Sequence, residues 1–153
     1  MTDFSIKPED PDQPEILALL ADGEAYGAAL YPAESNHYLP LDALRADNVL
    51  FLVARNAAGA AVGTAALASN SDWAEIKRMW VAPAARGQGL SRQLLAALET
   101  HARASGITVI RLETGMHNHE ALGLYRRTGY LERDAFAPYG PDPLSIFMEK
   151  RLD

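Results

Sequence analysis

The stretch VAPAARGQGLSRQLLAAL, residues 81–98, constrains the fold more than any other part of the chain. Gly87 and Gly89 follow the cation Arg86 and lead directly into leucines at helical spacing. A helix cap needs neither two glycines nor an arginine. The N–H groups and the dipole at a helix N-terminus attract anions, and glycine lets a ligand approach the backbone closely. The stretch therefore predicts an anion-binding loop that opens a helix.

The length of the chain and its lack of cysteine limit the class of protein. A chain of 153 residues is long enough to bury one core, so we expect a single domain over residues 1–153. The sequence contains no cysteine, which excludes disulfides, cysteine-ligated zinc and a thiol nucleophile. This composition is typical of the reducing cytoplasm, where we expect the protein to act.

The charge of the chain points away from polyanionic partners. A formal net charge of -6 argues against binding to nucleic acid or to an anionic membrane surface, and it leaves room for a cationic small molecule. The first residues, MTDFSIKPEDPDQPE, are acidic and lack the apolar segment of a signal peptide. No stretch is apolar for long enough to span a bilayer. We therefore expect no nucleic acid and no membrane among the partners.

Strands and helices are mixed along the chain. β-Branched and aromatic runs predict strands over residues 4–8, 48–56, 60–69, 74–82, 107–114, 130–136 and 144–152. Apolar spacing predicts helices over residues 14–30, 41–46, 90–104 and 119–128. The helix after the glycine loop has one apolar face, formed by Leu90, Leu94, Leu95, Leu98 and Ala102. Three early strands followed by a strand–helix–strand unit favour an α+β fold with a mixed, partly parallel sheet.

Three phosphate-binding templates can be compared with the loop. A Walker loop needs Lys and then Ser or Thr after its last glycine, whereas Gly89 is followed by Leu90 and Ser91. A dinucleotide fingerprint needs a third glycine and a later acidic residue, which GQGLSR does not supply cleanly. The third template is Arg/Gln-x-x-Gly-x-Gly/Ala. Its places hold Arg86, Gly89 and, instead of the usual Gly or Ala, Ser91. With VAP before it, the loop resembles the acyl-CoA pyrophosphate loop of the GNAT N-acetyltransferase superfamily.

A second stretch, NHEALGLYRRTGY at residues 118–130, is similar to the other signature of this superfamily. Asn118 and Tyr125 match its asparagine and tyrosine, and Gly129 with Tyr130 matches its turn into the next strand. The two motifs come in the family's order, and the resemblance covers residues 47–152. It implies the GNAT acyl-CoA N-acyltransferase fold, in which helices flank a central, twisted and mostly antiparallel sheet.

The resemblance implies acetyl-CoA as the cosubstrate and no metal. A strand edge at Met79 and Val81 would bind the pantetheine amides through main-chain groups, and the loop N–H groups would hold the pyrophosphate. The residues that the resemblance assigns to the cofactor are Met79, Val81, Arg86, Gly87, Gln88, Gly89, Leu90, Ser91, Asn118 and Tyr125. The pair His117 and His119 has no evident third ligand and does not predict a metal site.

The family transfers the acetyl group by direct attack of an amine on the thioester, which agrees with a chain without cysteine. The resemblance implies Tyr125 as the acid that protonates the leaving thiolate. Glu75 lies four residues before Met79, which resembles the position of the glutamate base in the histone-acetylating branch. Glu113 is the competing base, and a water chain is the third alternative. A main-chain N–H near Met79 would stabilise the oxyanion.

The strand at residues 74–82 combines charged and apolar side chains that would not share one face of a sheet. Strict alternation would place Glu75 and Lys77 on the same face as Met79 and Val81. A β-bulge within the strand would relieve this conflict. The sequence therefore suggests a bulge here.

The connection YPAESNHYLP, residues 31–40, is polar and aromatic, and in this fold it would form one wall of the acceptor pocket. Phe136, Tyr139 and the prolines after Phe136 would form another wall. The candidate acceptor-binding residues are Tyr31, Glu34, His37, Glu113 and Tyr139.

The sequence thus favours an N-acetyltransferase that moves the acetyl group of acetyl-CoA onto a primary amine of a small molecule. One alternative is an enzyme that acetylates a protein or peptide. Another is a regulatory module that binds acyl-CoA without catalysis. The acidic balance disfavours aminoacyl-tRNA as the acceptor. The sequence is compatible with a homodimer.

Overall fold

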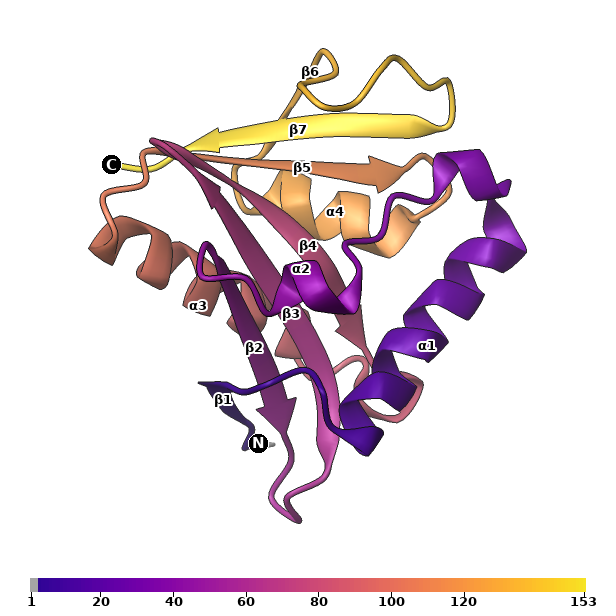
Figure 1. Ribbon diagram of the computed structural model, residues 1–153, viewed down its shortest axis with the longest axis vertical. Helices are drawn as coiled ribbons and strands as arrows, with labels where there is room; N and C mark the ends of the chain where they lie inside the picture. Colours follow the sequence, from indigo (N-terminus) through magenta and orange to yellow (C-terminus); the bar gives the residue numbers. More distant parts are fainter. Residues whose placement is uncertain (1–2) are drawn as a thin grey trace.

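The computed structural model describes residues 3–153, which form a seven-stranded sheet with helices on both faces (Figure 1). The strands are β1 (Ser5–Pro8), β2 (Val49–Arg55), β3 (Ala61–Asn70), β4 (Trp73–Val81), β5 (Val109–Gly115), β6 (Leu131–Arg133) and β7 (Ser145–Arg151). The α-helices are α1 (Pro14–Leu30), α2 (Leu41–Leu44), α3 (Leu90–Ala104) and α4 (His119–Arg127). Two short 3-10 helices are η1 (Ala33–Ser35) and η2 (Pro83–Ala85).

The sheet has the strand order β1-β2-β3-β4-β5-β7-β6. The neighbours β4 and β5 are parallel, and the other neighbouring strands are antiparallel. Helix α3 lies in the crossover that parallel strands require. The structure therefore confirms the α+β class and the mostly antiparallel sheet.

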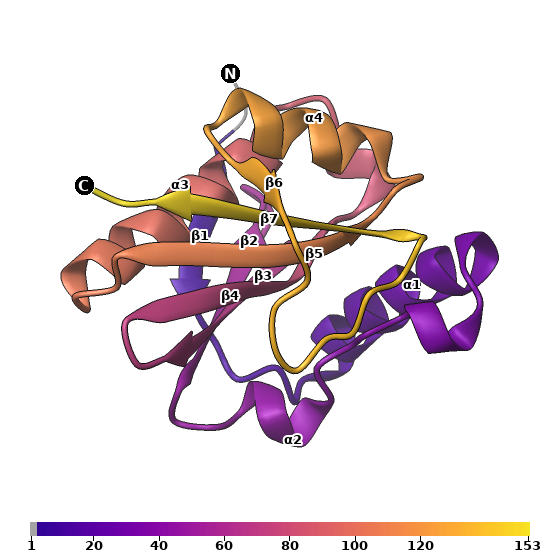
Figure 2. The same cartoon turned by 90° about the horizontal axis from the view of Figure 1, so that it is seen from above.

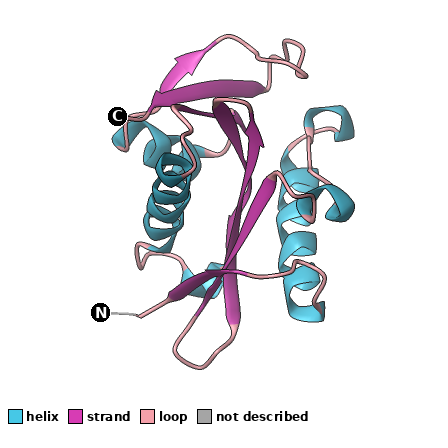
Figure 3. Cartoon of the chain, turned by 60° about the vertical axis from the view of Figure 1, so that its left-hand side comes forward, coloured by secondary structure: helices cyan, strands magenta, loops and turns pink. Residues whose placement is uncertain are grey.

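Two apolar cores lie on opposite faces of the sheet, one under α3 and α4 and the other under α1 and α2 (Figure 2 and Figure 3). The apolar face expected for the helix after the loop is confirmed. It is buried against the sheet through Leu90, Leu94, Leu95, Leu98 and Ala102. On the other face, Ile16 and Leu20 of α1 pack on strand residues with Leu44 of α2.

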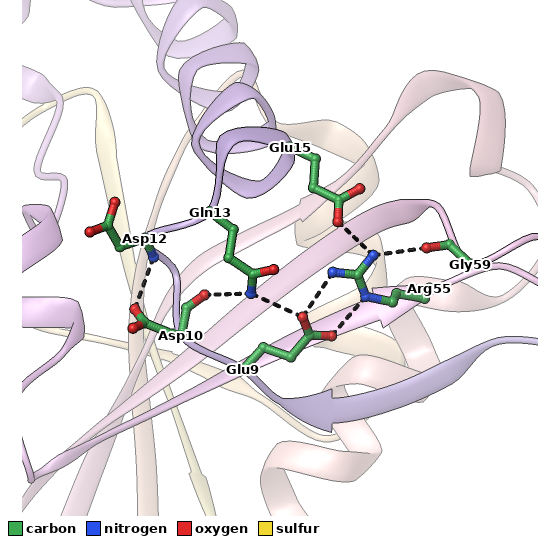
Figure 4. Close-up of polar contacts among 7 residues, drawn as sticks. All are labelled: Glu9, Asp10, Asp12, Gln13, Glu15, Arg55 and Gly59. Atoms are coloured by element: carbon green, nitrogen blue, oxygen red, sulfur yellow. Dashed lines mark hydrogen bonds and ion pairs between the residues drawn. The ribbon is translucent and has the colours of Figure 1, made fainter.

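The end of β2 anchors the start of α1 (Figure 4). The Arg55 guanidinium lies 2.9 Å from the Glu9 carboxylate, 2.7 Å from Glu15 and 2.8 Å from the Gly59 carbonyl. Three parts of the chain, namely the end of β1, the first turn of α1 and the β2–β3 turn, thus meet at one guanidinium. Such a fork of donors suits several oxygen acceptors at once.

The strand expected over residues 130–136 is shorter in the structure, where β6 covers Leu131–Arg133. Tyr130 is buried, and its hydroxyl donates to Glu99 at 2.9 Å. After Arg133 the chain leaves the sheet, and Phe136 packs edge-on against Phe147. At each end of the expected strand, an aromatic side chain is therefore packed into the interior instead of continuing the strand pairing.

One extra residue interrupts the pairing of β3 with β4. The partners of Lys77 and Trp80 are only two residues apart on β3, so two residues of β4 share one position. Arg78 has a φ of 54° at this bulge, a left-handed conformation that is uncommon for a non-glycine residue. The Thr64 hydroxyl donates to the Arg78 carbonyl at 2.7 Å. The bulge suggested by the sequence is confirmed.

The bulge changes which side chains share a face. Ala66, opposite Lys77, belongs to the core under α1, so Glu75 and Lys77 lie on that side of the sheet. Met79 and Val81 belong to the core under α3. Strict alternation, which would place all four on one face, is therefore wrong.

The parallel strands β4 and β5 pair over a short distance only. Their pairing covers Trp73–Glu75 and Val109–Arg111. Beyond this point the two strands point in different directions (Figure 1). The remainder of β4 therefore has an edge that β5 does not cover.

None of the helices within residues 3–153 has the length and the apolar character that a membrane span needs.

Candidate active site

A cavity of about 770 Å³ lies where β4 and β5 diverge. Its walls come from β4 on both sides of the bulge, the end of β5, α1 with the following connection, the start of α3, and α4. Arg86 and Gly89 of the loop, Tyr125 and Glu113 all line it. Residues expected for cofactor binding and for acceptor binding therefore face one continuous space.

The glycine loop presents its backbone to this cavity. Gly87 and Gly89 have φ values of 78° and 79°, which glycine adopts without the strain of a side chain. A Cβ at either position would meet no atom within 4 Å, so the glycines leave open space rather than fill a tight contact. Gly89 is the N-cap of α3, without a side-chain cap or an acid in the first turn. The first N–H groups of α3 are thus available to an anion.

Arg86 is held beside the loop by two contacts from β4. Its Nε donates to the Val81 carbonyl at 3.1 Å, and its guanidinium lies 4.9 Å from the centroid of the Trp80 ring. Trp80 in turn packs on Tyr26 of α1, with 5.5 Å between ring centroids. Neither contact uses the terminal nitrogens of Arg86, which can therefore face a phosphate.

Other residues expected at the cofactor differ in their placement. The cavity is lined by Met79, Val81, Leu90, Ser91 and Asn118. Gln88 is exposed and does not line it, and its side chain lies 3.5 Å from the Ala84 carbonyl. Gln88 therefore lies outside the cavity lining, and its role at the cofactor stays a prediction.

Tyr125 of α4 lines the cavity and is otherwise buried against Tyr130, with 5.6 Å between ring centroids. Burial raises the pKa of the Tyr125 hydroxyl above its usual value, so the hydroxyl holds its proton at neutral pH. Asn118 is the N-cap residue of α4. Its amide donates to the Thr114 hydroxyl at 3.1 Å and accepts from the Tyr31 hydroxyl at 3.1 Å.

Glu75 is buried and does not line the cavity. The Tyr139 hydroxyl donates to its carboxylate, and Lys77 Nζ lies 3.3 Å from the same oxygen. A phenol and a cation thus both engage this carboxylate within the protein. The structure thus places the expected base in a fixed ion pair.

Glu113 of β5 lines the cavity. Burial raises the pKa of its carboxyl, and a hydrogen bond from the Ser145 hydroxyl, at 2.7 Å, acts in the opposite direction. Among residues 3–153, no basic side chain forms an ion pair with it within 4.0 Å. Glu113 therefore combines access to the cavity with a pKa shifted toward neutrality, as a general base requires.

The connection after α1 forms a wall of the cavity, as expected. Tyr31 and His37 both line it. The Tyr31 hydroxyl also accepts from the His117 N–H at 3.0 Å, and a Cβ on Gly115 would lie only 2.0 Å from this hydroxyl. Tyr31 thus fixes the end of α1 onto the β5–α4 turn, which requires glycine at position 115.

Two expected acceptor residues do not line the cavity. Glu34 is exposed on η1 and lies outside the cavity lining, so its role in acceptor binding stays a prediction. Tyr139 also lies outside the cavity lining, but it packs edge-on against His37, with 5.2 Å between ring centroids. It supports the wall from behind through His37 and Lys77.

Sequence reasoning did not assign several residues that line the cavity, among them Tyr26, Lys77, Arg78 and Trp80. The suspected bulge on β4 was a signal for Lys77 and Arg78, because a bulge re-aims side chains near a site. Ser145 gave no signal, since it meets Glu113 only through the pairing of β7 with β5.

Among the described residues, no three potential ligands gather at His117 and His119 or elsewhere to hold a metal.

The chain is similar to known acyltransferases. The model of the acetyltransferase (GNAT) family matches residues 11–130. A relative from Azospirillum brasilense, named IAA acetyltransferase, is 44% identical over 154 residues, which cover 99% of this chain and 100% of the relative.

Two solved structures share the fold. One, from Klebsiella pneumoniae and assigned as an acyl-CoA N-acyltransferase, has a TM-score of 0.84 and 42% identity over 98% of each chain. The other is the PaiA N-acetyltransferase of Thermoplasma acidophilum in complex with coenzyme A. It has a TM-score of 0.78 and 19% identity, and the match covers 98% of this chain and 99% of that chain.

Proposed function

Because the chain belongs to the acetyltransferase (GNAT) family, whose cosubstrate is acetyl-CoA, we propose that it transfers the acetyl group directly onto a primary amine of a small molecule. The observation that carries this proposal is that the glycine loop, Tyr125 and Glu113 all line the same cavity. An acetyl donor and an amine can meet in that space without a covalent acyl-enzyme.

The cofactor end of the cavity is formed by the loop and the free edge of β4. The N–H groups from Gly87 to Ser91 and the dipole of α3 hold the pyrophosphate, and Arg86 adds positive charge. Main-chain groups at Met79 and Val81 bind the pantetheine amides, because β5 has diverged from this part of β4. A main-chain N–H near Met79 donates to the oxyanion.

Glu113, rather than Glu75, is the base in this proposal. Glu113 takes a proton from the ammonium group, and the amine nitrogen then attacks the thioester carbon. The carbon–nitrogen bond forms and the carbon–sulfur bond breaks. Tyr125 gives its proton to the leaving sulfur and regains one as the new amide nitrogen loses its second proton. The raised pKa of Tyr125 keeps that proton in place until the thiolate develops.

The proposal is tested by measuring thiol release from acetyl-CoA with a panel of acceptors. The panel holds small primary amines, peptides with free N-termini, and IAA, which the name of the Azospirillum relative includes. We expect a small primary amine to give the highest kcat/KM, and the Glu113→Gln variant to lose most of this activity. A peptide that surpasses every small amine, or thiol release from none of them, contradicts the proposal.

A further inference from the structure

The charged side chains of the acceptor half of the cavity differ in how they are paired. The acceptor half of the cavity is the part lined by α1, residues 35–39, Lys77, Arg78 and Glu113. Its lysine and its arginine each form an ion pair with a carboxylate, whereas Glu113 forms none within 4.0 Å among the described residues. This difference decides which charges remain for a substrate.

Lys77 has three polar partners within the protein. Its Nζ lies 3.3 Å from the Glu75 carboxylate, donates to the His37 carbonyl at 3.0 Å, and donates to the Tyr139 hydroxyl. Two of the three donors of the ammonium group are thus used in hydrogen bonds, and its charge is paired with Glu75. Lys77 therefore holds the wall at His37 and is neutralised by Glu75.

Arg78 holds the same wall two residues further along. Its Nε and Nη2 donate to the Leu39 carbonyl at 3.2 and 3.1 Å, and its Nη1 lies 2.9 Å from Glu24 of α1. The ring of Tyr38 lies 5.0 Å from the guanidinium carbon. The Arg78 side chain is 9% exposed and has a paired carboxylate, so a second anion would have to compete with Glu24.

Glu113 is the remaining charge. It has the Ser145 hydroxyl as its hydrogen-bond partner and, among the described residues, no cation within 4.0 Å. An ammonium ion would complete this site, whereas a substrate carboxylate would meet repulsion from Glu113 and, among the lysine and arginine side chains of this half, none without a carboxylate partner.

From this pairing we infer that the acceptor is an amine cation that carries no carboxylate, such as an aromatic or alkyl amine, and not an amino acid. The inference rests on the proposed function, because it assumes that the amine binds at Glu113. It makes Lys77 and Arg78 positioning residues for the wall at residues 37–39, and not carboxylate-binding residues.

Matched acceptor pairs test the inference with the wild-type enzyme. Tyramine is compared with tyrosine and phenethylamine with phenylalanine at saturating acetyl-CoA. We expect kcat/KM to be at least about tenfold higher for the member without a carboxylate, equivalent to about 1.4 kcal/mol. The methyl esters of the two amino acids keep the added bulk without the charge, and should recover most of the lost activity.

The outcomes separate the inference from the function it rests on. If the amino acids are used as well as or better than the amines, the inference is wrong while acetyl transfer to amines stands. The same conclusion follows if the methyl esters are as poor acceptors as the free amino acids. If no amine of the panel is acetylated, the proposed function itself is wrong.

A variant tests the role of the Glu24–Arg78 pair. Glu24 is 47% exposed, so Glu24→Gln should fold normally and leave Arg78 without its carboxylate. We expect the preference for tyramine over tyrosine to fall by a measurable factor, mainly through a lower KM for tyrosine. Asp22→Asn, an exposed position of the same helix outside the cavity lining, is the matched control and should leave the preference unchanged. A preference that Glu24→Gln does not alter overturns the assignment of Arg78.

Discussion

Tyr125 packs edge-on against Tyr130 while it also lines the cavity. A buried aromatic ring is a common core element, and its hydroxyl normally needs a partner or contact with solvent. The cavity supplies that access, so the same side chain can stabilise α4 and hold a proton for the leaving thiolate. These two roles can be separated by removing a single oxygen.

We predict that Tyr125→Phe lowers kcat by about 10²-fold or more, because general acid catalysis typically contributes 10²–10⁴-fold. Phenylalanine fills the same space, so acetyl-CoA affinity should change little. Steady-state kinetics and calorimetry measure the two quantities.

Tyr130→Phe is the matched control for this variant. Tyr130 is equally buried but lies outside the cavity lining, and its hydroxyl donates to Glu99. Removal of this hydroxyl should lower the free energy of unfolding by about 1–3 kcal/mol, because a hydrogen bond to a charged group is lost. The value of kcat should remain nearly unchanged. A full kcat in Tyr125→Phe would remove this residue from the mechanism.

The second prediction concerns Glu113 and pH. The base must be deprotonated, so kcat/KM should fall on the acidic side as Glu113 takes up a proton. The Ser145 hydroxyl stabilises the charged carboxylate and lowers its pKa, against the larger effect of burial. Ser145→Ala removes this stabilisation, so the pKa of Glu113 rises and the acidic limb moves to higher pH. The measurement is kcat/KM across pH for both proteins.

Two glutamate variants complete this test. Glu113→Gln should abolish the limb together with most of the activity. Glu75→Gln should keep the limb but move it slightly to lower pH, because the Glu75 charge makes a small contribution to the raised pKa of Glu113. Glu75 itself is bound to Lys77 and Tyr139 outside the cavity lining. Loss of the limb in Glu75→Gln, with an unchanged limb in Ser145→Ala, would return the role of base to Glu75.

At the scale of elements, the start of α3 can be tested by comparing two glycines. Gly89 and Gly59 both have positive φ, at 79° and 86°, and a Cβ at either would meet nothing within 4 Å. Only Gly89 lines the cavity. Valine at either position should therefore cost similar backbone strain, about 1–2 kcal/mol.

We predict that Gly89→Val weakens binding of coenzyme A by more than about tenfold, equivalent to about 1.4 kcal/mol, because the side chain occupies the space for the pyrophosphate. Gly59→Val, in the β2–β3 turn, should destabilise the fold to a similar extent and keep the affinity. Calorimetric titration with coenzyme A compares the two. Equal affinities would mean that the loop does not hold the pyrophosphate.

The whole molecule is organised around one sheet, whose edge strands are β1 and β6 and which includes β7 near the C-terminus. The two apolar cores share its strands. We therefore propose that residues 1–153 form a single domain.

The prediction at this scale is a single cooperative unfolding transition, because both cores pack on the same strands and neither can unfold without disrupting the other. Coenzyme A at 100 times its Kd should stabilise the folded state by about 2.7 kcal/mol and raise Tm without splitting the transition. Scanning calorimetry with and without coenzyme A measures both effects. Two resolved transitions would contradict the single domain.

Local patterns were sufficient for much of this protein. The apolar spacing after the glycine loop predicted the buried face of α3, because residues three and four apart lie side by side on a helix. The positions of the loop and of Tyr125 also followed from motifs of neighbouring residues. In each of these cases the interacting groups lie within a few residues of one another along the chain.

Other features depended on how distant segments meet. The bulge at Arg78 and the divergence of β4 from β5 leave Glu75 in an ion pair and bring Glu113 to the cavity. Ser145 reaches Glu113 only through the register of β7 on β5. The chain has a net charge of -6, yet four arginines, Arg78, Arg86, Arg92 and Arg127, line one cavity. A sequence lists residue types and their local spacing. The pKa and the partners of a carboxylate depend on atoms that only the folded chain brings within a few ångströms.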